Sequence, residues 1–337
     1  MNHARQAVEL IRSGLNPGSI RAQGSLSLVP LFGGIPAKEY LLASDAIASG
    51  LLTISEMGAG SVPEILAHNQ ADQPVLLLDG EHVEGAMQNR VLNVTVLVAA
   101  NQKTVLPVAC VERGRWHYED RSAFAPSADI TYSRLRSKNA AAAAMSARRE
   151  RGRGVDQHEV WADVSAKHAE IGVDESATGA MRHAYDQRRR DLEEMTSSFS
   201  EPEAGQTGVI ACVGGSAVAL DAFDRPETLA KLWSRLVSGY AMDALGTPQG
   251  GVDDDAARVF LETAASSETS SHEGVGLGQD VVLTSPTTVG HALIWEGGVV
   301  HLAIFTTEER NDRGARTGGR IASPRGRRHL QRFPDQL

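Results

Sequence analysis

The chain has 337 residues, of which 42% are hydrophobic and 22% charged, so it can form a buried core and is neither fibrous nor wholly disordered. Its formal net charge of −9 at pH 7 argues against nucleic acid as a partner. Two cysteines, Cys110 and Cys212, are too few for a disulfide framework and fit a reducing compartment. The first residues lack a signal-peptide pattern, and no apolar run reaches the roughly 18 residues of a membrane helix, so we expect a cytoplasmic protein with no membrane partner.

The N-terminal third is predicted to be mainly β-structure. Residues 1–24 predict a short amphipathic helix that ends at a Gly/Pro turn at residues 16–18. Residues 25–116 contain short apolar runs separated by Gly, Pro, Asn and Asp, which is typical of strands. The clearest pair of strands, residues 91–98 and 104–111, predicts a hairpin with a polar turn.

The pattern changes to helix after residue 137. Good helix formers dominate from about 137 to 200, which predicts a helical insertion between two β-rich parts. Within it, Asp156 with Glu159 three residues later resembles a capping box and predicts a helix start.

The C-terminal half is predicted to combine hairpins with one strong helix. Its expected elements are a hairpin of residues 208–213 and 217–222, a helix at 225–245, a Ser/Thr-rich loop at 266–273, and two strands at 290–295 and 299–305.

These elements predict an α+β fold, with a largely antiparallel β-sheet, a helical insertion and one long packed helix in the C-terminal half. We expect residues 1–24 to form an N-terminal helix and turn, and residues 25–309 to form a single domain. Residues 310–337 contain eight arginines and two aspartates and few apolar residues. This tail is expected to lack a fixed structure and is a candidate contact for a protein partner.

The densest run of polar side chains follows an apolar strand at residues 75–78. It extends from Asp79 to Thr95 and contains Gln88, Asn89, Arg90 and Asn93. Side-chain amides can form hydrogen bonds with the hydroxyl groups of a ligand, and the guanidinium group of arginine can bind a carboxylate or phosphate.

A second polar segment spans residues 107–116. Its Arg115 and Trp116 stand side by side after a glycine, an arrangement that suits holding a phosphate and stacking on a base or sugar. If the predicted hairpin turns at its centre, Asn93 faces Cys110 and Val91 faces Glu112. Both polar segments then meet at the end of the hairpin away from the turn.

These two segments resemble the ADP-ribosylglycohydrolase- and rhodanese-phosphatase-associated protein domain family. Met87 and Ala109 stand where that family's pattern has lysine and serine. The matching residues are Asp79-Gly80-Glu81, Gly85-Ala86, Gln88-Asn89-Arg90, Asn93 and Thr95 in the first segment, and Pro107-Val108, Cys110, Glu112 and Gly114-Arg115-Trp116 in the second.

The resemblance implies a link to ADP-ribose or NAD-derived metabolites, and hence binding of a phosphorylated ribonucleotide-type ligand, with its hydrolysis as a further hypothesis. In this interpretation the arginines bind phosphate, the tryptophan stacks on a base or sugar, and the amides form hydrogen bonds with the hydroxyl groups of the ligand. The ligand-binding candidates are Gln88, Asn89, Arg90, Asn93, Arg115 and Trp116, and the candidates for a catalytic general base are Glu81 and Glu112.

Each assignment has a structural alternative. The amides and arginines also suit a buried polar network that joins strand ends, and Glu81 and Glu112 also suit ion pairs with neighbouring arginines. Cys110, on an apolar strand, suits a small core residue. If these alternatives hold, the protein is a non-catalytic scaffold or partner-binding module.

The sequence predicts no metal site and no cofactor. Glu81, His82 and Glu84 form the densest acid/histidine run, but on a strand Glu81 points away from the other two. Only two ligands then converge, fewer than a zinc site needs. His301 lies in an apolar strand and is expected to be a partly buried strand histidine.

Overall fold

A computed structural model describes residues 3–34, 36–58, 60–115, 124–149, 152–174, 176–251 and 254–307. Within this part of the chain the protein has the α+β fold and the largely antiparallel sheets that the sequence predicts. Trp116 and the arginine-rich tail expected at 310–337 lie outside the described residues.

The largest sheet has nine strands in the described part of the chain, in the order β1-β3-β13-β14-β18-β17-β16-β15, with β2 beside β3. All of its neighbouring strands are antiparallel. The strands are β1 (Leu15–Pro17), β2 (Arg21–Gln23), β3 (Leu26–Gly33), β13 (Gln206–Val213), β14 (Ser216–Phe223), β15 (Glu268–Glu273), β16 (Gln279–Thr284), β17 (Thr288–Trp295) and β18 (Gly298–Thr306).

Two smaller sheets come from residues 41–130. One has the order β10-β7-β4 and the other β12-β8-β9-β11-β6-β5. Their strands are β4 (Leu41–Leu42), β7 (Val75–Leu77) and β10 (Val96–Val98) in the first, and β5 (Leu52–Glu56), β6 (Glu64–Asn69), β8 (Glu81–Gly85), β9 (Arg90–Leu92), β11 (Lys103–Cys110) and β12 (Phe124–Ile130) in the second. The short helix α2 (Ala43–Ala48) packs on them.

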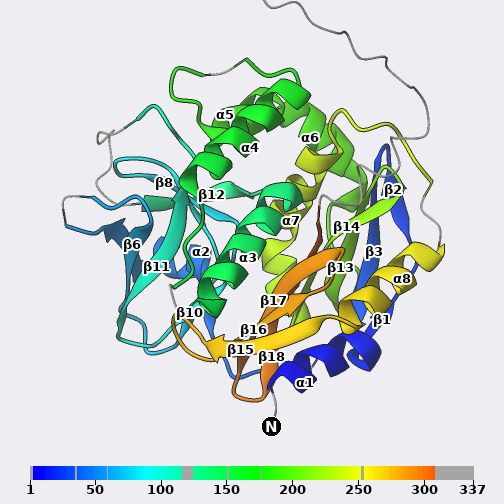
Figure 1. Cartoon of the computed structure of the whole chain (residues 1–337), viewed down its shortest axis with the longest axis horizontal. Coiled ribbons are helices and arrows are strands. Elements are labelled where there is room, and N and C mark those ends of the chain that lie inside the picture. The colour runs from blue at the N-terminus through cyan, green and yellow to red at the C-terminus, as the bar shows by residue number, and fades with distance from the viewer. Residues whose placement is uncertain are drawn as a thin grey trace, which may run out of the picture.

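Helices cover both faces of the large sheet (Figure 1). The apolar faces of α1 (His3–Glu9) and α8 (Asp254–Ala265) pack on one face, with a π-turn at Leu10–Gly14. On the other face, α3 (Ser133–Arg148) and α7 (Pro226–Ala244) share one apolar core with the smaller sheets. The helical stretch continues with α4 (Gln157–Glu170), α5 (Met181–Gln187), α6 (Arg189–Thr196) and a 3-10 turn at Ser197–Phe199.

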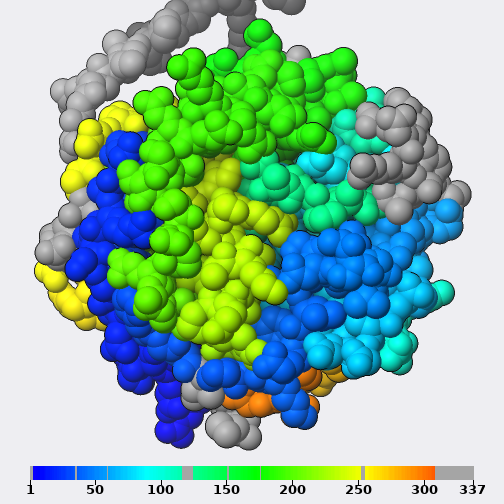
Figure 2. All heavy atoms as spheres, turned by 180° about the vertical axis from the view of Figure 1, so that it is seen from behind, coloured from blue at the N-terminus to red at the C-terminus, as the bar shows by residue number. Residues whose placement is uncertain are grey.

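The central helix α7 follows from its sequence. Pro226 occupies its first turn, and Leu229, Leu232 and Leu236 place apolar side chains along one face. At Gly239 the helix approaches β12 so closely that a Cβ atom would lie 2.8 Å from the Cγ2 atom of Ile130. Seen from behind in Figure 2, α7 (yellow-green) lies between N-terminal segments (blue) and the helical stretch (green). Helix α7 therefore shares one apolar core with the large sheet, the smaller sheets and the helical stretch.

Several local predictions are confirmed. The β13–β14 hairpin turns at Gly214 and Gly215, which both have positive φ, and the two strands predicted near the C-terminal end are present as β17 and β18, which pair with each other. Asp156 caps α4 by accepting hydrogen bonds from the backbone N–H groups of His158 and Glu159.

The predicted hairpin register is wrong. The segment at residues 91–98 is divided between two sheets, because β9 pairs with β11 whereas β10 pairs with β7. Cys110 lies opposite Arg90 instead of Asn93, and Val91 lies opposite Ala109 instead of Glu112. The predicted strand is interrupted between β9 and β10, where the Thr95 hydroxyl forms hydrogen bonds with Asp79 and His301. These side-chain contacts replace the continuous pairing with residues 104–111 that the hairpin would require.

Three segments that were expected to be turn or loop form strands. Residues 15–17 and 21–23 pair with β3, and the Ser/Thr-rich segment at 268–273 forms β15. Because β15 is an edge strand, its polar residues keep access to water.

Candidate functional site

The two polar segments of the sequence meet in a buried cluster, which we call the motif network. It consists of Gln88, Asn89, Arg90, Cys110, Glu112 and Arg115. Arg115 Nε and NH2 donate hydrogen bonds of 2.9 and 2.6 Å to Oε2 of Glu112, and NH2 also donates to Oδ1 of Asn89 at 3.1 Å. The same Glu112 oxygen accepts a hydrogen bond from the backbone N–H of Asn89. The network thus ties the two segments together.

Arg90 belongs to the same buried cluster. Its NH1 group donates to Oε1 of Gln88 at 3.1 Å, and NH2 lies 3.5 Å from Oε1 of Glu56. Burial is the main cause that lowers the pKa of Arg90, and burial also raises the pKa of the Cys110 thiol. Arg90 is 0% exposed and Arg115 is 2% exposed, so neither guanidinium faces solvent in this conformation.

Glu81 and Glu112, the two predicted general bases, pair with different arginines. Glu81 Oε1 accepts a hydrogen bond of 2.5 Å from NH1 of Arg235 on α7, and its Oε2 accepts one from the backbone N–H of Leu78. Glu112 pairs with Arg115 instead. The two carboxylates therefore belong to separate buried ion pairs.

Asn93 lies near the loop between α3 and α4. Its Nδ2 group donates to the carbonyl oxygen of Arg153 at 3.3 Å, and Oδ1 is a buried atom with no hydrogen-bond partner among the described residues. Trp116, the predicted stacking residue, lies outside the described part of the chain.

A second buried cluster, which we call the His–Asp network, was missed by the sequence analysis. Asp79 and Thr95 of the first polar segment join four residues from distant elements, namely Arg136, Asp221, His291 and His301. The sequence feature that could have revealed it is a titratable residue inside an apolar strand, as at Asp221 and His301. His301 is fully buried, in contrast to the partial burial expected for it.

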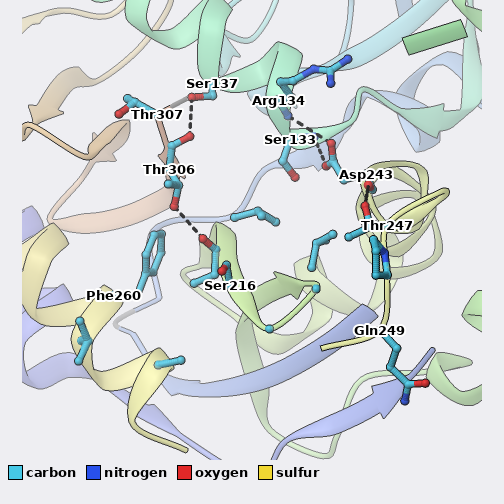
Figure 3. A pocket seen from close by; sticks show the side chains of 18 of the residues that line it. Ser133, Arg134, Ser137, Ser216, Asp243, Thr247, Gln249, Phe260, Thr306 and Thr307 are labelled. Carbon is cyan, nitrogen blue, oxygen red and sulfur yellow. Dashed lines mark hydrogen bonds between the residues drawn. The ribbon is translucent and has the colours of Figure 1, made fainter. Parts of the chain in front are cut away.

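A cleft of about 1180 Å³ opens where α3, α4, α7, α8 and the β13–β14 turn meet (Figure 3). None of the predicted site residues is among the described residues that line it. Its polar lining comprises Ser133, Arg134, Ser137, Lys167, Glu170, Ser216, Asp243, Thr247, Gln249, Asp255, Thr306 and Thr307.

Charges of both signs lie in the wall of the cleft. Glu170 accepts hydrogen bonds from Arg134 at 2.6 Å and from Lys167 at 2.9 Å. Asp243 accepts from the backbone N–H groups at the start of α3, at 2.6 and 3.4 Å. Burial raises the pKa of Asp243, although Lys167 and these hydrogen bonds oppose the shift.

Ser133 contributes a buried hydroxyl to the cleft. It is 3% exposed, and its hydroxyl has no partner in good hydrogen-bond geometry among the described residues, although it is near enough to Asp243 to help lower the pKa of that carboxyl. A buried hydroxyl without a partner costs about 1–3 kcal/mol, so a group that bonds to it is favoured there.

Comparison with known proteins identifies the family but no individual relative. Searches of the curated proteins and of the solved structures found no match. Among the described residues, no helix has both the length and the hydropathy needed to cross a bilayer. The family model of the ARG and Rhodanese-Phosphatase-superfamily-associated Protein domain, ARPP-1, matches residues 14–305, so the chain belongs to this family.

Proposed function

We propose that the protein binds a phosphorylated ribonucleotide-type ligand, such as ADP-ribose, in the cleft beside α3. The observation that carries the proposal is the combination of size and lining. Ligand pockets usually measure about 300–1,000 Å³, and this cleft, at about 1180 Å³, is large enough for a nucleotide.

The lining supplies groups that such a ligand needs. Arg134 presents a guanidinium for phosphate, and the hydroxyls of Ser133, Thr247 and Thr306 suit the hydroxyls of a ribose. The family's name, which associates it with ARG and rhodanese-phosphatase proteins, is compatible with this ligand class.

Glu170 opposes binding of an anion, because it already occupies Arg134 and Lys167. A phosphate that reaches these cations must compete with the Glu170 carboxylate. Removal of that negative charge should therefore strengthen binding, whereas removal of a cation should weaken it.

For the motif network the burial supports the structural alternative: these residues hold two chain segments together. Direct ligand contact by Gln88, Asn89, Arg90, Asn93 and Arg115, and a catalytic role for Glu81 or Glu112, remain predictions. Hydrolysis is likewise a hypothesis that the experiment below examines.

Calorimetry and thermal unfolding of the full chain with ADP-ribose, AMP, ribose 5-phosphate and adenosine test the proposal. The phosphorylated ligands should raise the Tm and adenosine should do so less. Ser133→Ala and Arg134→Gln should weaken binding about tenfold, because a neutral hydrogen bond contributes about 0.5–1.5 kcal/mol and one to a charged group about 1.5–3 kcal/mol. Glu170→Gln should strengthen binding, because it removes the carboxylate that competes for Arg134 and Lys167. Chromatography of the reaction mixture reports hydrolysis.

Arg182→Gln is the matched control, because Arg182 is an exposed arginine in ion pairs with Glu84 and Asp186, away from the cleft lining. It should bind like the wild type. The proposal fails if no ligand shifts the Tm of the folded protein, or if the three cleft variants bind like the wild type. Self-association or protein capture together with no nucleotide response would favour the scaffold alternative.

A further inference from the structure

Three potential metal ligands converge in the His–Asp network. Oδ1 of Asp79, Nε2 of His291 and Nδ1 of His301 all lie within 4.8 Å of one another. The residues are 2%, 4% and 0% exposed. They come from the turn after β7 and from the neighbouring strands β17 and β18, so the backbone of two sheets holds them in place.

The separations of these atoms suit a small cation. Oδ1 of Asp79 lies 3.4 Å from Nε2 of His291 and 3.7 Å from Nδ1 of His301. Zinc lies about 2.0–2.2 Å from N and O ligands, so two ligands of a tetrahedral site are about 3.3–3.6 Å apart. The two distances from Asp79 match these values closely, and the two histidine nitrogens lie within 4.8 Å of each other.

A further carboxylate orients one of the rings. Nε2 of His301 lies 3.0 Å from Oδ1 of Asp221. Because a carboxylate only accepts, this nitrogen carries the proton, and in the neutral ring the lone pair of Nδ1 is left for the Thr95 hydroxyl, 2.8 Å away, or for a metal ion. A carboxylate on the outer nitrogen of a histidine is the usual arrangement around a metal-bound imidazole.

Thr95 provides an oxygen at the centre of the three atoms. Its hydroxyl lies 2.8 Å from Nδ1 of His301, 3.4 Å from Nε2 of His291 and 3.2 Å from Oδ1 of Asp79. In the present conformation this hydroxyl links the three ligand atoms.

Two carboxylates and one guanidinium meet in the network. Asp79 and Asp221 carry two negative charges, and Arg136 hydrogen-bonds with both of them. Arg136 contacts each oxygen of Asp79 once, and Oδ1 also accepts from the hydroxyl of Thr95, so a cation bound to Oδ1 would take the place of that hydroxyl proton.

A narrow recess reaches His291 from outside. It measures about 10 Å³, enough for roughly one water molecule, and its lining includes Arg153, Asp280 and His291. Arg153 and Asp280 form an ion pair of 3.0 Å at this place, and each side chain is 9% exposed. A small ion could enter here once this pair separates, whereas a nucleotide could not.

We propose that Asp79, His291 and His301 bind a divalent transition-metal ion of the zinc type, with Asp221 as the positioning residue behind His301. Two imidazole nitrogens and one carboxylate oxygen are a donor set that favours zinc and related first-row ions over calcium or magnesium. The site stabilises the contact between the large sheet and the smaller sheets. It is independent of the cleft and of the function proposed for it.

The test uses the full chain prepared without a histidine tag. After treatment with a chelator and its removal, the protein is titrated with Co²⁺ and then Zn²⁺, and binding is followed by visible absorption, elemental analysis and calorimetry. We expect one ion per chain and a Tm that rises with Zn²⁺. His291→Gln and His301→Gln should abolish tight binding, and Asp221→Asn should weaken it about tenfold to a hundredfold.

His158→Gln is the matched control, because His158 is an exposed histidine at the start of α4, outside the His–Asp network, and this variant should bind like the wild type. Circular dichroism establishes that each variant is folded. If a variant does not fold, the wild-type titration still decides. The proposal is overturned if stripped wild-type protein takes up neither ion, or if folded His291→Gln and His301→Gln bind as tightly as the wild type.

Discussion

Asp79 and Asp221 lie in different parts of the fold and accept hydrogen bonds from the same guanidinium, that of Arg136. Asp79 follows β7 of a small sheet, whereas Asp221 is in β14 of the large sheet. The four N···O distances are between 2.7 and 3.1 Å, and the Arg136 side chain is 1% exposed. Helix α3 therefore joins two sheets through a buried ionic contact.

Replacement of Arg136 by methionine should destabilise the protein strongly. It leaves Asp79 and Asp221 as buried carboxylates without their cation, and breaking such a pair costs about 3–5 kcal/mol. The free energy of unfolding is measured in urea. Arg258→Gln, which removes an exposed pair on α8, should leave it nearly unchanged, because exposed ion pairs contribute little to stability. Equal stability of both variants would contradict the inference.

Replacement of Arg115 by lysine distinguishes the structural role of the motif network from ligand contact. Lysine keeps the charge but loses the planar fork that bonds to Glu112, Asn89 and the carbonyl oxygen of Ala86. We expect a loss of about 2 kcal/mol or more in the free energy of unfolding. Affinity for the nucleotide ligands, measured by calorimetry below the new Tm, should stay within a factor of three. A selective loss of affinity without loss of stability would place the ligand at this network.

The elements that were predicted well depend on local patterns. The periodic leucines of α7 and the paired glycines between β13 and β14 act within a few residues, so a single sequence reveals them. The choice of partner strand is different. Thr95 ends the pairing of β9 with β11 by bonding to His301, which lies 206 residues further along the chain. No local pattern contains that information.

The candidate sites show the same limit. The motif network could be predicted from the sequence, because its two segments lie about twenty residues apart and pair with each other through β9 and β11. The His–Asp network draws on residues from 79 to 301, and only the packing of α3 between the sheets brings them together. The cleft depends on the ends of four helices and one turn, none of which carries a recognisable motif.

Replacement of Gly239 by alanine should destabilise α7, although alanine normally favours a helix over glycine by about 1 kcal/mol. A Cβ atom there would lie 2.8 Å from Cγ2 of Ile130 and 3.2 Å from the carbonyl oxygens of Ile130 and Thr131. The helix must move away from β12, and such overpacking costs about 1–3 kcal/mol. Urea unfolding gives the sign directly. A gain in stability would show that β12 yields to the added methyl group.

His82 should make the protein lose stability as the pH falls through the mildly acidic range. It is fully buried, its Nε2 atom lies 2.7 Å from the hydroxyl of Thr131, and that hydroxyl itself donates to the carbonyl oxygen of Gly80. The Thr131 oxygen therefore accepts a hydrogen bond from Nε2 of a neutral His82. Burial lowers the pKa of His82 to about 4; Asp129 opposes this shift and Arg235 adds to it.

In the unfolded chain the histidine has its ordinary pKa of about 6.5, so between about pH 6.5 and 4 the unfolded state binds a proton that the folded state does not. The free energy of unfolding therefore keeps its full value above about pH 6.5. It decreases as the pH falls toward 4, by up to about 3 kcal/mol. His82→Gln keeps a donor for Thr131 but does not titrate, so its stability should fall less over this window. Urea unfolding of both proteins at several pH values measures the difference, with the exposed His158→Gln variant expected to follow the wild type. Parallel curves for the wild type and His82→Gln would show that His82 does not remain neutral in the folded protein.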